Sequence, residues 1–106
     1  MGTGSWYVAQ NPFDRMDHPV DAGMPSPTIR LGAALRNRRK SLGLTQQELA
    51  RLAGCGLAFL YELESGKATV RLDKLLGVLG VLGLELSLVE GKDALGVDTH
   101  WLAESV

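Results

Sequence analysis

A glycine between two short helical patterns is the feature that most constrains the fold of this chain. Thr45 and Glu48 are spaced as a capping box, in which each side chain satisfies a free backbone N–H at a helix start. Apolar residues then recur at helical spacing. Gly54 follows where a helix must end, because glycine adopts the left-handed conformation without a Cβ penalty. The sequence therefore predicts two helices, over 46–53 and 57–65, joined by a tight turn.

One further helix is predicted on each side of this pair. Pro27 suits the start of a helix over 28–41, because its missing N–H would have no intrahelical partner. A fourth helix fits 71–82, with five leucines expected to face inward: Leu72, Leu75, Leu76, Leu79 and Leu82. Gly77 and Gly80 lie on its other side and each costs roughly 1 kcal/mol relative to alanine. Either another backbone approaches closely there or the loss is tolerated.

Residues 84–90 alternate between apolar and polar, which is typical of a half-buried strand. Leu84, Leu86 and Leu88 share its apolar side. A lone strand after four helices leaves a backbone edge unpaired. We expect it to pair with the same strand of a second copy in a homodimer; pairing with residues 6–9 of the same chain is the alternative.

The length of 106 residues predicts one small domain with tails. Residues 1–27 hold all four prolines and show little helical period, so they predict a flexible N-terminal arm. Residues 28–90 form the predicted helical domain with its dimerisation strand, and 91–106 a flexible C-terminal tail. The aromatic residues of the arm and Trp101 of the tail are candidates for partner contacts.

Charge is distributed unevenly along the chain. By count of charged side chains, residues 1–27 carry −2, residues 28–75 carry +5 and residues 76–106 carry −4. Positive charge is therefore concentrated on and around the two-helix segment. Two helices joined by a tight turn can present the second helix to the major groove of DNA. The basic residues near that helix would then lie close to the phosphates. A mixed, solvated surface would give the same split.

Several classes of protein are disfavoured by the composition. The single cysteine, Cys55, permits no internal disulfide and no thiolate zinc site. No apolar run is long enough to span a membrane, and the N-terminus lacks a secretory pattern, so we expect a cytoplasmic protein. His18 and His100 have no second ligand at metal spacing. Neither a catalytic constellation nor a phosphate loop is present, so we expect no enzyme, cofactor or metal.

Short motifs along the central part of the chain are Leu42-Gly43-Leu44-Thr45-Gln46, Glu48-Leu49-Ala50, Gly54, Leu60, Leu63-Glu64 and Gly66-Lys67. In these motifs the segment 29–90 resembles the Xre/Cro family of helix-turn-helix regulators, which implies an all-α, lambda-repressor-like fold of four or five helices. The segments 63–67, 70–74 and 82–86 are similar to the HipB-like antitoxin branch. That resemblance implies a homodimeric repressor that binds a palindromic double-stranded DNA operator at its own promoter. It also implies a second partner, a HipA-like kinase toxin.

Basic residues crowd the last turn of the first helix: Arg36, Arg38, Arg39 and Lys40. They suit the helix dipole, and phosphate contact is the functional interpretation, for which Arg38 and Lys40 are selected.

The resemblance implies further residues that meet DNA. Gln46 and Lys67 are expected at phosphates, although an exposed helix residue and a solvated loop lysine are the alternatives. The residues expected to face bases are Leu57, Ala58, Tyr61 and Glu62; Gly56, where relatives carry a Ser or Thr cap, is also placed in the DNA-binding site. Arg39 and Glu64 match a pair that bridges the first and third helices in relatives, so Arg39 is interpreted first as a structural ion pair and second as a phosphate ligand.

The third helix departs from the family pattern. Leu57 and Ala58 stand where relatives carry polar, base-reading side chains, and they can offer only packing against thymine methyl groups. Glu62 can accept a hydrogen bond from a cytosine amine, or its carboxylate can simply repel the phosphate backbone of the DNA. Specificity would then depend on phosphate positions and DNA shape. The competing hypothesis is a protein-interaction module that kept the fold and lost DNA reading.

Overall fold

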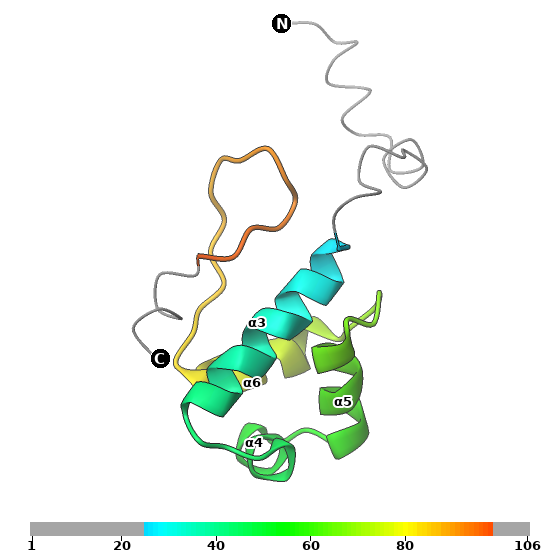
Figure 1. Ribbon diagram of the computed structural model, residues 1–106, viewed down its shortest axis with the longest axis vertical. Helices are drawn as coiled ribbons and strands as arrows, with labels where there is room; N and C mark the ends of the chain where they lie inside the picture. Colours follow the sequence, from blue (N-terminus) through cyan, green and yellow to red (C-terminus); the bar gives the residue numbers. More distant parts are fainter. Residues whose placement is uncertain (1–24, 99–106) are drawn as a thin grey trace, which may run out of the picture.

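The computed structural model describes residues 25–98, which contain four helices: α3 (Pro27–Ser41), α4 (Gln46–Ala53), α5 (Leu57–Ser65) and α6 (Leu72–Leu82). α3 and α4 each pack against both α5 and α6 (Figure 1). Residues 83–98 continue without helix as a looped segment on the side of α3 away from α5. This agrees with the expected all-helical class. None of the described helices is long and apolar enough to cross a membrane.

The predicted start and end of α4 are confirmed. The Thr45 hydroxyl accepts a hydrogen bond from the Glu48 N–H at 3.0 Å, and the Glu48 carboxylate accepts one from the Thr45 N–H at 2.8 Å. Gly54 has a φ of +70° and closes the helix in the left-handed conformation. The bounds of α4 and α5 are those predicted from the sequence. Local signals therefore suffice for this pair of helices.

The outer helices differ slightly from the prediction. α3 begins one residue earlier, at Pro27, because the Ser26 hydroxyl caps it by accepting from the Ile29 N–H at 3.3 Å. α6 begins one residue later, at Leu72, with Arg71 as its N-cap. All four helices contribute to one core, in which the largest fully buried side chains are Leu35, Leu49, Leu60, Val78 and Leu82.

The predicted inward face of α6 is partly wrong. Leu75, Leu79 and Leu82 are buried as expected, but Leu72 and Leu76 are 56% and 46% exposed. Val78 takes their place in the core. α6 meets α4 and α3 along the side that carries Val78, so a five-leucine stripe is too wide for the surface that these helices cover.

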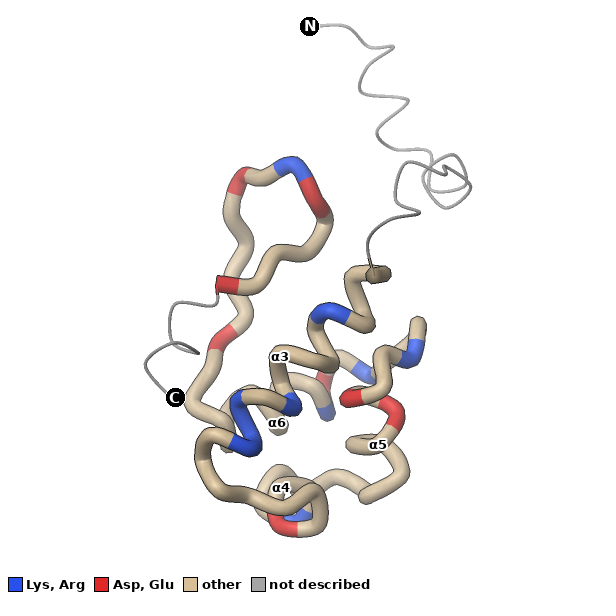
Figure 2. Tube along the Cα trace, viewed as in Figure 1, with Lys and Arg blue, Asp and Glu red and all other residues tan. Residues whose placement is uncertain are grey.

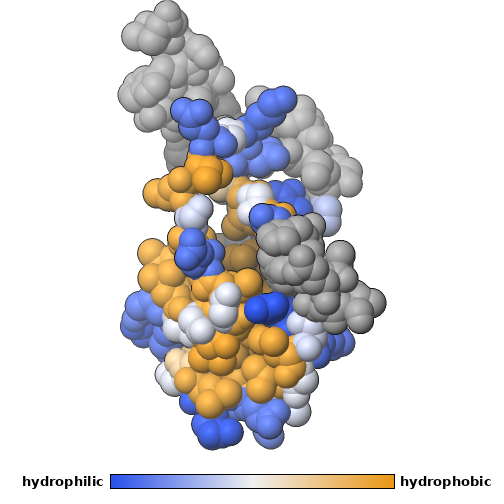
Figure 3. Space-filling model, turned by 90° about the vertical axis from the view of Figure 1, so that its left-hand side faces the viewer, coloured by the Kyte–Doolittle hydropathy of each residue, from blue (hydrophilic) through white to orange (hydrophobic). Residues whose placement is uncertain are grey.

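The exposed leucines belong to a wider set of apolar side chains at the surface: Leu42, Leu52, Leu72, Leu76, Leu86, Leu88 and Val89. Figure 3 shows the side that lies on the left in Figure 1, and apolar surface covers much of the lower part of that face. Such a surface on a small helical domain is typical of a region that a partner covers.

The predicted strand is not formed in the single chain. No strand occurs within residues 25–98, and residues 84–90 have no regular secondary structure. Pairing with a second copy stays a prediction, since one chain cannot supply that partner. The alternative partner, residues 6–9, lies outside the described residues, as do Trp101 and most of the proposed arm.

Glycines set the closest approaches between helices. A Cβ at Gly32 of α3 would overlap the carbonyl oxygens of Leu63 and Glu64 in α5. A Cβ at Gly77 would lie 3.2 Å from the carbonyl oxygen of Ala53, whereas at Gly80 it would meet nothing within 4 Å. The two unexplained glycines of α6 thus differ: at Gly77 another backbone comes close, and at Gly80 the loss of helix propensity is simply tolerated.

Two substitutions by alanine test this packing. We expect Gly32→Ala to destabilise the fold by about 1–3 kcal/mol, because α3 must move away from α5. Gly80→Ala should stabilise it by roughly 1 kcal/mol, because the site is open and alanine favours the helix. Urea unfolding of both variants at one protein concentration measures the difference. A Gly32→Ala variant as stable as Gly80→Ala would contradict the close approach.

Candidate nucleic-acid interface

A buried ion pair positions α5 against α3. The Arg39 Nε donates to Glu64 Oε2 at 2.8 Å and Nη2 donates to Oε1 at 3.1 Å, and only 9% and 4% of the two side chains are exposed. Arg39 Nη1 also donates to the Leu44 carbonyl at 2.8 Å. The pair expected from the resemblance is therefore present, and with the bond to Leu44 it engages all three nitrogens of the Arg39 guanidinium.

Gln46 extends this network to the first turn of α4. Its Nε2 donates to Glu64 Oε1 at 3.0 Å. The Glu64 carboxylate therefore connects α3, α4 and α5 at one point. Gln46 is half-buried, so its side chain is held in place at the N-terminus of α4. There the unpaired N–H groups of a helix favour an anion.

A small open groove of about 250 Å³ lies over this network, lined by Arg36, Arg39, Gln46, Tyr61, Glu64 and Ser65. Arg36 is exposed. It belongs to the basic cluster at the end of α3, for which phosphate contact is one interpretation, but it is not among the residues selected as DNA contacts. Arg36 lies three residues before Arg39 and so shares its side of α3. The groove brings an unassigned cation beside two predicted contact residues, Gln46 and Tyr61.

The outer face of α5 carries the predicted base-facing residues. Ala58, Tyr61 and Glu62 are exposed, and Gly56 is an exposed N-cap that offers no side-chain hydrogen bond. Leu57 is half-buried and packs against the core, which limits how much of it can reach outward. Leu60, on the opposite side of the helix, is fully buried in the core.

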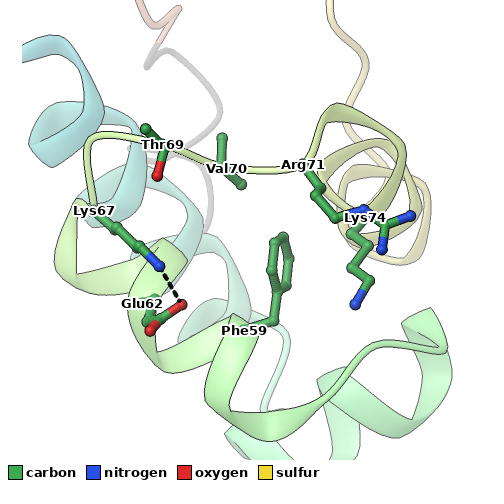
Figure 4. A pocket seen from close by; sticks show the side chains of 7 residues that line it. All are labelled: Phe59, Glu62, Lys67, Thr69, Val70, Arg71 and Lys74. Carbon is green, nitrogen blue, oxygen red and sulfur yellow. Dashed lines mark hydrogen bonds and ion pairs between the residues drawn. The ribbon is translucent and has the colours of Figure 1, made fainter.

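A second groove, of about 450 Å³, borders the opposite side of α5 and is shown in Figure 4. Three cations line it, Lys67, Arg71 and Lys74. The Lys67 ammonium lies 3.1 Å from Glu62 Oε1, and Arg71 pairs with Asp73 at 2.6 Å. The Lys74 ammonium lies 5.6 Å from the centre of the Phe59 ring. Of these cations, sequence reasoning selected only Lys67.

The structure does not bring every predicted phosphate ligand to α5. Arg38 points toward the C-terminus of α6, where its Nε donates to the Leu82 carbonyl at 2.9 Å. Lys40 is exposed in the last turn of α3. Figure 2 shows basic residues along α3 and near α5, and acidic residues along the 83–98 segment. The site predictions for Arg38 and Lys40 stay predictions.

Within residues 25–98, three groups have a shifted pKa. Hydrogen bonds from the Thr45 backbone and hydroxyl lower the pKa of Glu48, and the hydrogen bond from Arg71 lowers the pKa of Asp73. Burial raises the pKa of the Cys55 thiol, which therefore stays protonated near neutral pH. Residues 25–98 contain no group of three or more side chains suited to hold a metal ion, while His18 and His100 lie outside that range.

The arrangement suits a duplex surface better than a small ligand. α5 presents an exposed face between two shallow, open grooves, each with at least one exposed cation. A helix of this kind fits the major groove while flanking cations reach the phosphates on either side.

Comparison with known proteins agrees with this geometry. Residues 35–89, just over half of the chain, match the family model HTH_3, described as helix-turn-helix. Over 59 residues the chain is 44% identical to y4mF of Sinorhizobium fredii, an uncharacterized HTH-type transcriptional regulator. That match covers 56% of this chain and 78% of the relative. Because the family model covers the second half of α3 and all of α4 to α6, the chain belongs to the Xre/Cro-like helix-turn-helix family of DNA-binding transcriptional regulators, which are generally not enzymes.

Proposed function

We propose that this protein is a sequence-specific repressor that inserts α5 into the major groove of an operator in double-stranded DNA. The observation that carries the proposal is the exposed face of α5 between two cation-bearing grooves. Arg36 and Gln46 would hold phosphates on one side of α5, and Lys67 on the other. Lys40 would add a phosphate contact from the end of α3.

Base contacts would come from the outer face of α5. Ala58 and the exposed part of Leu57 would pack against thymine methyl groups, and Tyr61 and Glu62 would supply the polar contacts. Gly56 allows close approach of the backbone, since a Cβ there would meet nothing within 4 Å. Few bidentate contacts are available, so phosphate positions would carry much of the affinity.

A promoter footprint and a salt titration test this proposal. We expect protection of a pseudo-palindrome in the protein's own promoter, with half-sites about 10 base pairs apart or a multiple of that. The logarithm of affinity should fall with the logarithm of salt concentration, and Arg36→Ala should reduce that slope by about 1. Lys92→Ala, an exposed cation in the 83–98 segment, is the control and should leave the slope unchanged. Promoter binding no tighter than binding to random DNA would favour the competing hypothesis, a protein-interaction module.

We further propose that the active form is a homodimer joined through residues 84–90. Leu86 and Leu88 are 52% and 97% exposed in the single chain, although their alternation is that of a strand with one buried side. Pairing with a second copy would cover them, together with Leu84, and satisfy the unpaired backbone. A twofold protein would also match a palindromic operator.

Two lysine substitutions test the dimer. Leu88→Lys should convert the dimer to a monomer in sedimentation experiments, because it places a charge in the apolar side of the proposed ribbon. Its helical circular dichroism should persist, since Leu88 is exposed in the single chain. Ser87→Lys, on the other side of the strand, is the control and should stay dimeric. A wild-type monomer at micromolar concentration, or an unaffected Leu88→Lys dimer, would contradict this interface.

A narrower role as the antitoxin of a HipA-like kinase toxin is proposed from the HipB-like segments 63–67, 70–74 and 82–86. The exposed apolar side chains of α4 and α6 offer surface for a second protein. We expect a tagged chain to co-purify with the product of the adjacent reading frame and to suppress its toxicity. An adjacent gene product that neither binds this chain nor arrests growth would contradict the role.

A further inference from the structure

One ion pair on the outer face of α5 joins a predicted base-facing residue to a predicted phosphate ligand. The Lys67 ammonium lies 3.1 Å from Glu62 Oε1, and about half of each side chain is exposed (Figure 4). In the free protein Glu62 therefore neutralises a cation that the proposed function needs at the DNA backbone.

The backbone fixes the distance between these two residues. Gly66 adopts a φ of +90°, its N–H donates to the Leu63 carbonyl at 3.2 Å, and the Lys67 N–H donates to the Glu62 carbonyl at 3.0 Å. This is the hydrogen-bond pattern of a Schellman helix end. The Thr28 hydroxyl also donates to the Gly66 carbonyl at 2.9 Å, which ties the turn to α3. Only the two side chains are free to exchange partners.

Helix energetics give little reason for a carboxylate at Glu62. Negative charge near a helix C-terminus is unfavourable, and α5 has two glutamates in its last turn and no basic residue. Glu64 is compensated by its buried pair with Arg39. Glu62 has only an exposed pair with Lys67, and pairs of that kind contribute little to stability. The pair can therefore open readily when DNA offers each partner a better one.

We propose that Glu62 and Lys67 form an exchangeable pair that makes the Lys67 phosphate contact conditional on a cytosine in the operator. On a site with cytosine opposite Glu62, the carboxylate accepts from the cytosine amine and Lys67 turns to a phosphate. At guanine and thymine the carboxylate meets only acceptors, and at adenine the N7 acceptor lies beside the amine. On such sites Glu62 keeps Lys67, and one phosphate contact is lost.

The inference rests on the proposed insertion of α5 into DNA and adds a specificity device to it. It predicts that Glu62 lowers affinity for the wrong DNA as well as raising affinity for the right DNA. Simple repulsion of DNA by a carboxylate would act on every site alike and would not depend on Lys67. These two mechanisms can be separated by removing Lys67.

A double-mutant cycle with Glu62→Ala, Lys67→Ala and the double variant is the test, measured on the footprinted operator and on random DNA across salt concentrations. Glu62→Ala should bind random DNA several-fold more tightly, with a salt slope steeper by about 1, because Lys67 is released. It should also lose at least about fivefold preference for cytosine at one position in each half-site. In the Lys67→Ala background, the gain on random DNA should disappear.

Asp93→Ala is the matched control, since it removes an exposed carboxylate from the 83–98 segment outside the proposed dimer strand and should leave base preference and salt slope unchanged. A gain on random DNA that persists in the double variant, or an equal change on operator and random DNA, would overturn the exchange. A wild-type protein without any footprint would refute the proposed function and this inference with it. A footprint with unchanged cytosine preference in Glu62→Ala would refute the inference alone.

Discussion

The buried pair of Arg39 and Glu64 is the interaction on which the rest of the domain depends. Apolar contacts between α3 and α5 are non-directional, so by themselves they permit small rotations of α5 about its axis. Two parallel hydrogen bonds between a guanidinium and a carboxylate have a fixed geometry, and here they join α3 to α5. Removal of either partner would leave a buried charge at a cost of about 3–5 kcal/mol.

The same pair organises the candidate interface, because Glu64 also accepts from Gln46 at the start of α4. The residue that fixes α5 is thus one helical turn from Tyr61 and beside the groove that contains Arg36. Gly32 complements this pair by letting the backbones of α3 and α5 come close. The stability of the fold and the orientation of α5 therefore depend on the same contacts. A substitution that weakens these contacts would also displace α5.

Local chemistry explains what the sequence could predict. The capping box at Thr45 and the glycine at Gly54 are self-contained signals, and α4 and α5 have the predicted bounds. The exposure of Leu72 was not predictable from α6 alone, because it depends on how far α3 and α4 extend across that helix. The hydrogen bond from Arg38 to the Leu82 carbonyl was likewise not predictable from α3 alone, because it depends on where α6 ends. The strand at 84–90 needs a partner that one chain does not contain.

Because α5 offers few side chains that can distinguish bases, the rigid arrangement of α3, α4 and α5 matters for specificity. In the proposed complex, Ala58 and the half-buried Leu57 would distinguish few base pairs, so discrimination beyond the cytosine contact of Glu62 would come from where the phosphates lie and how easily the duplex deforms. Such indirect reading works only if the groups that bind phosphates are held at fixed separations. Gln46 is fixed by Glu64, and the backbone of Lys67 by the turn at Gly66. A flexible domain with the same surface residues would bind any DNA duplex whose phosphates its cations could reach.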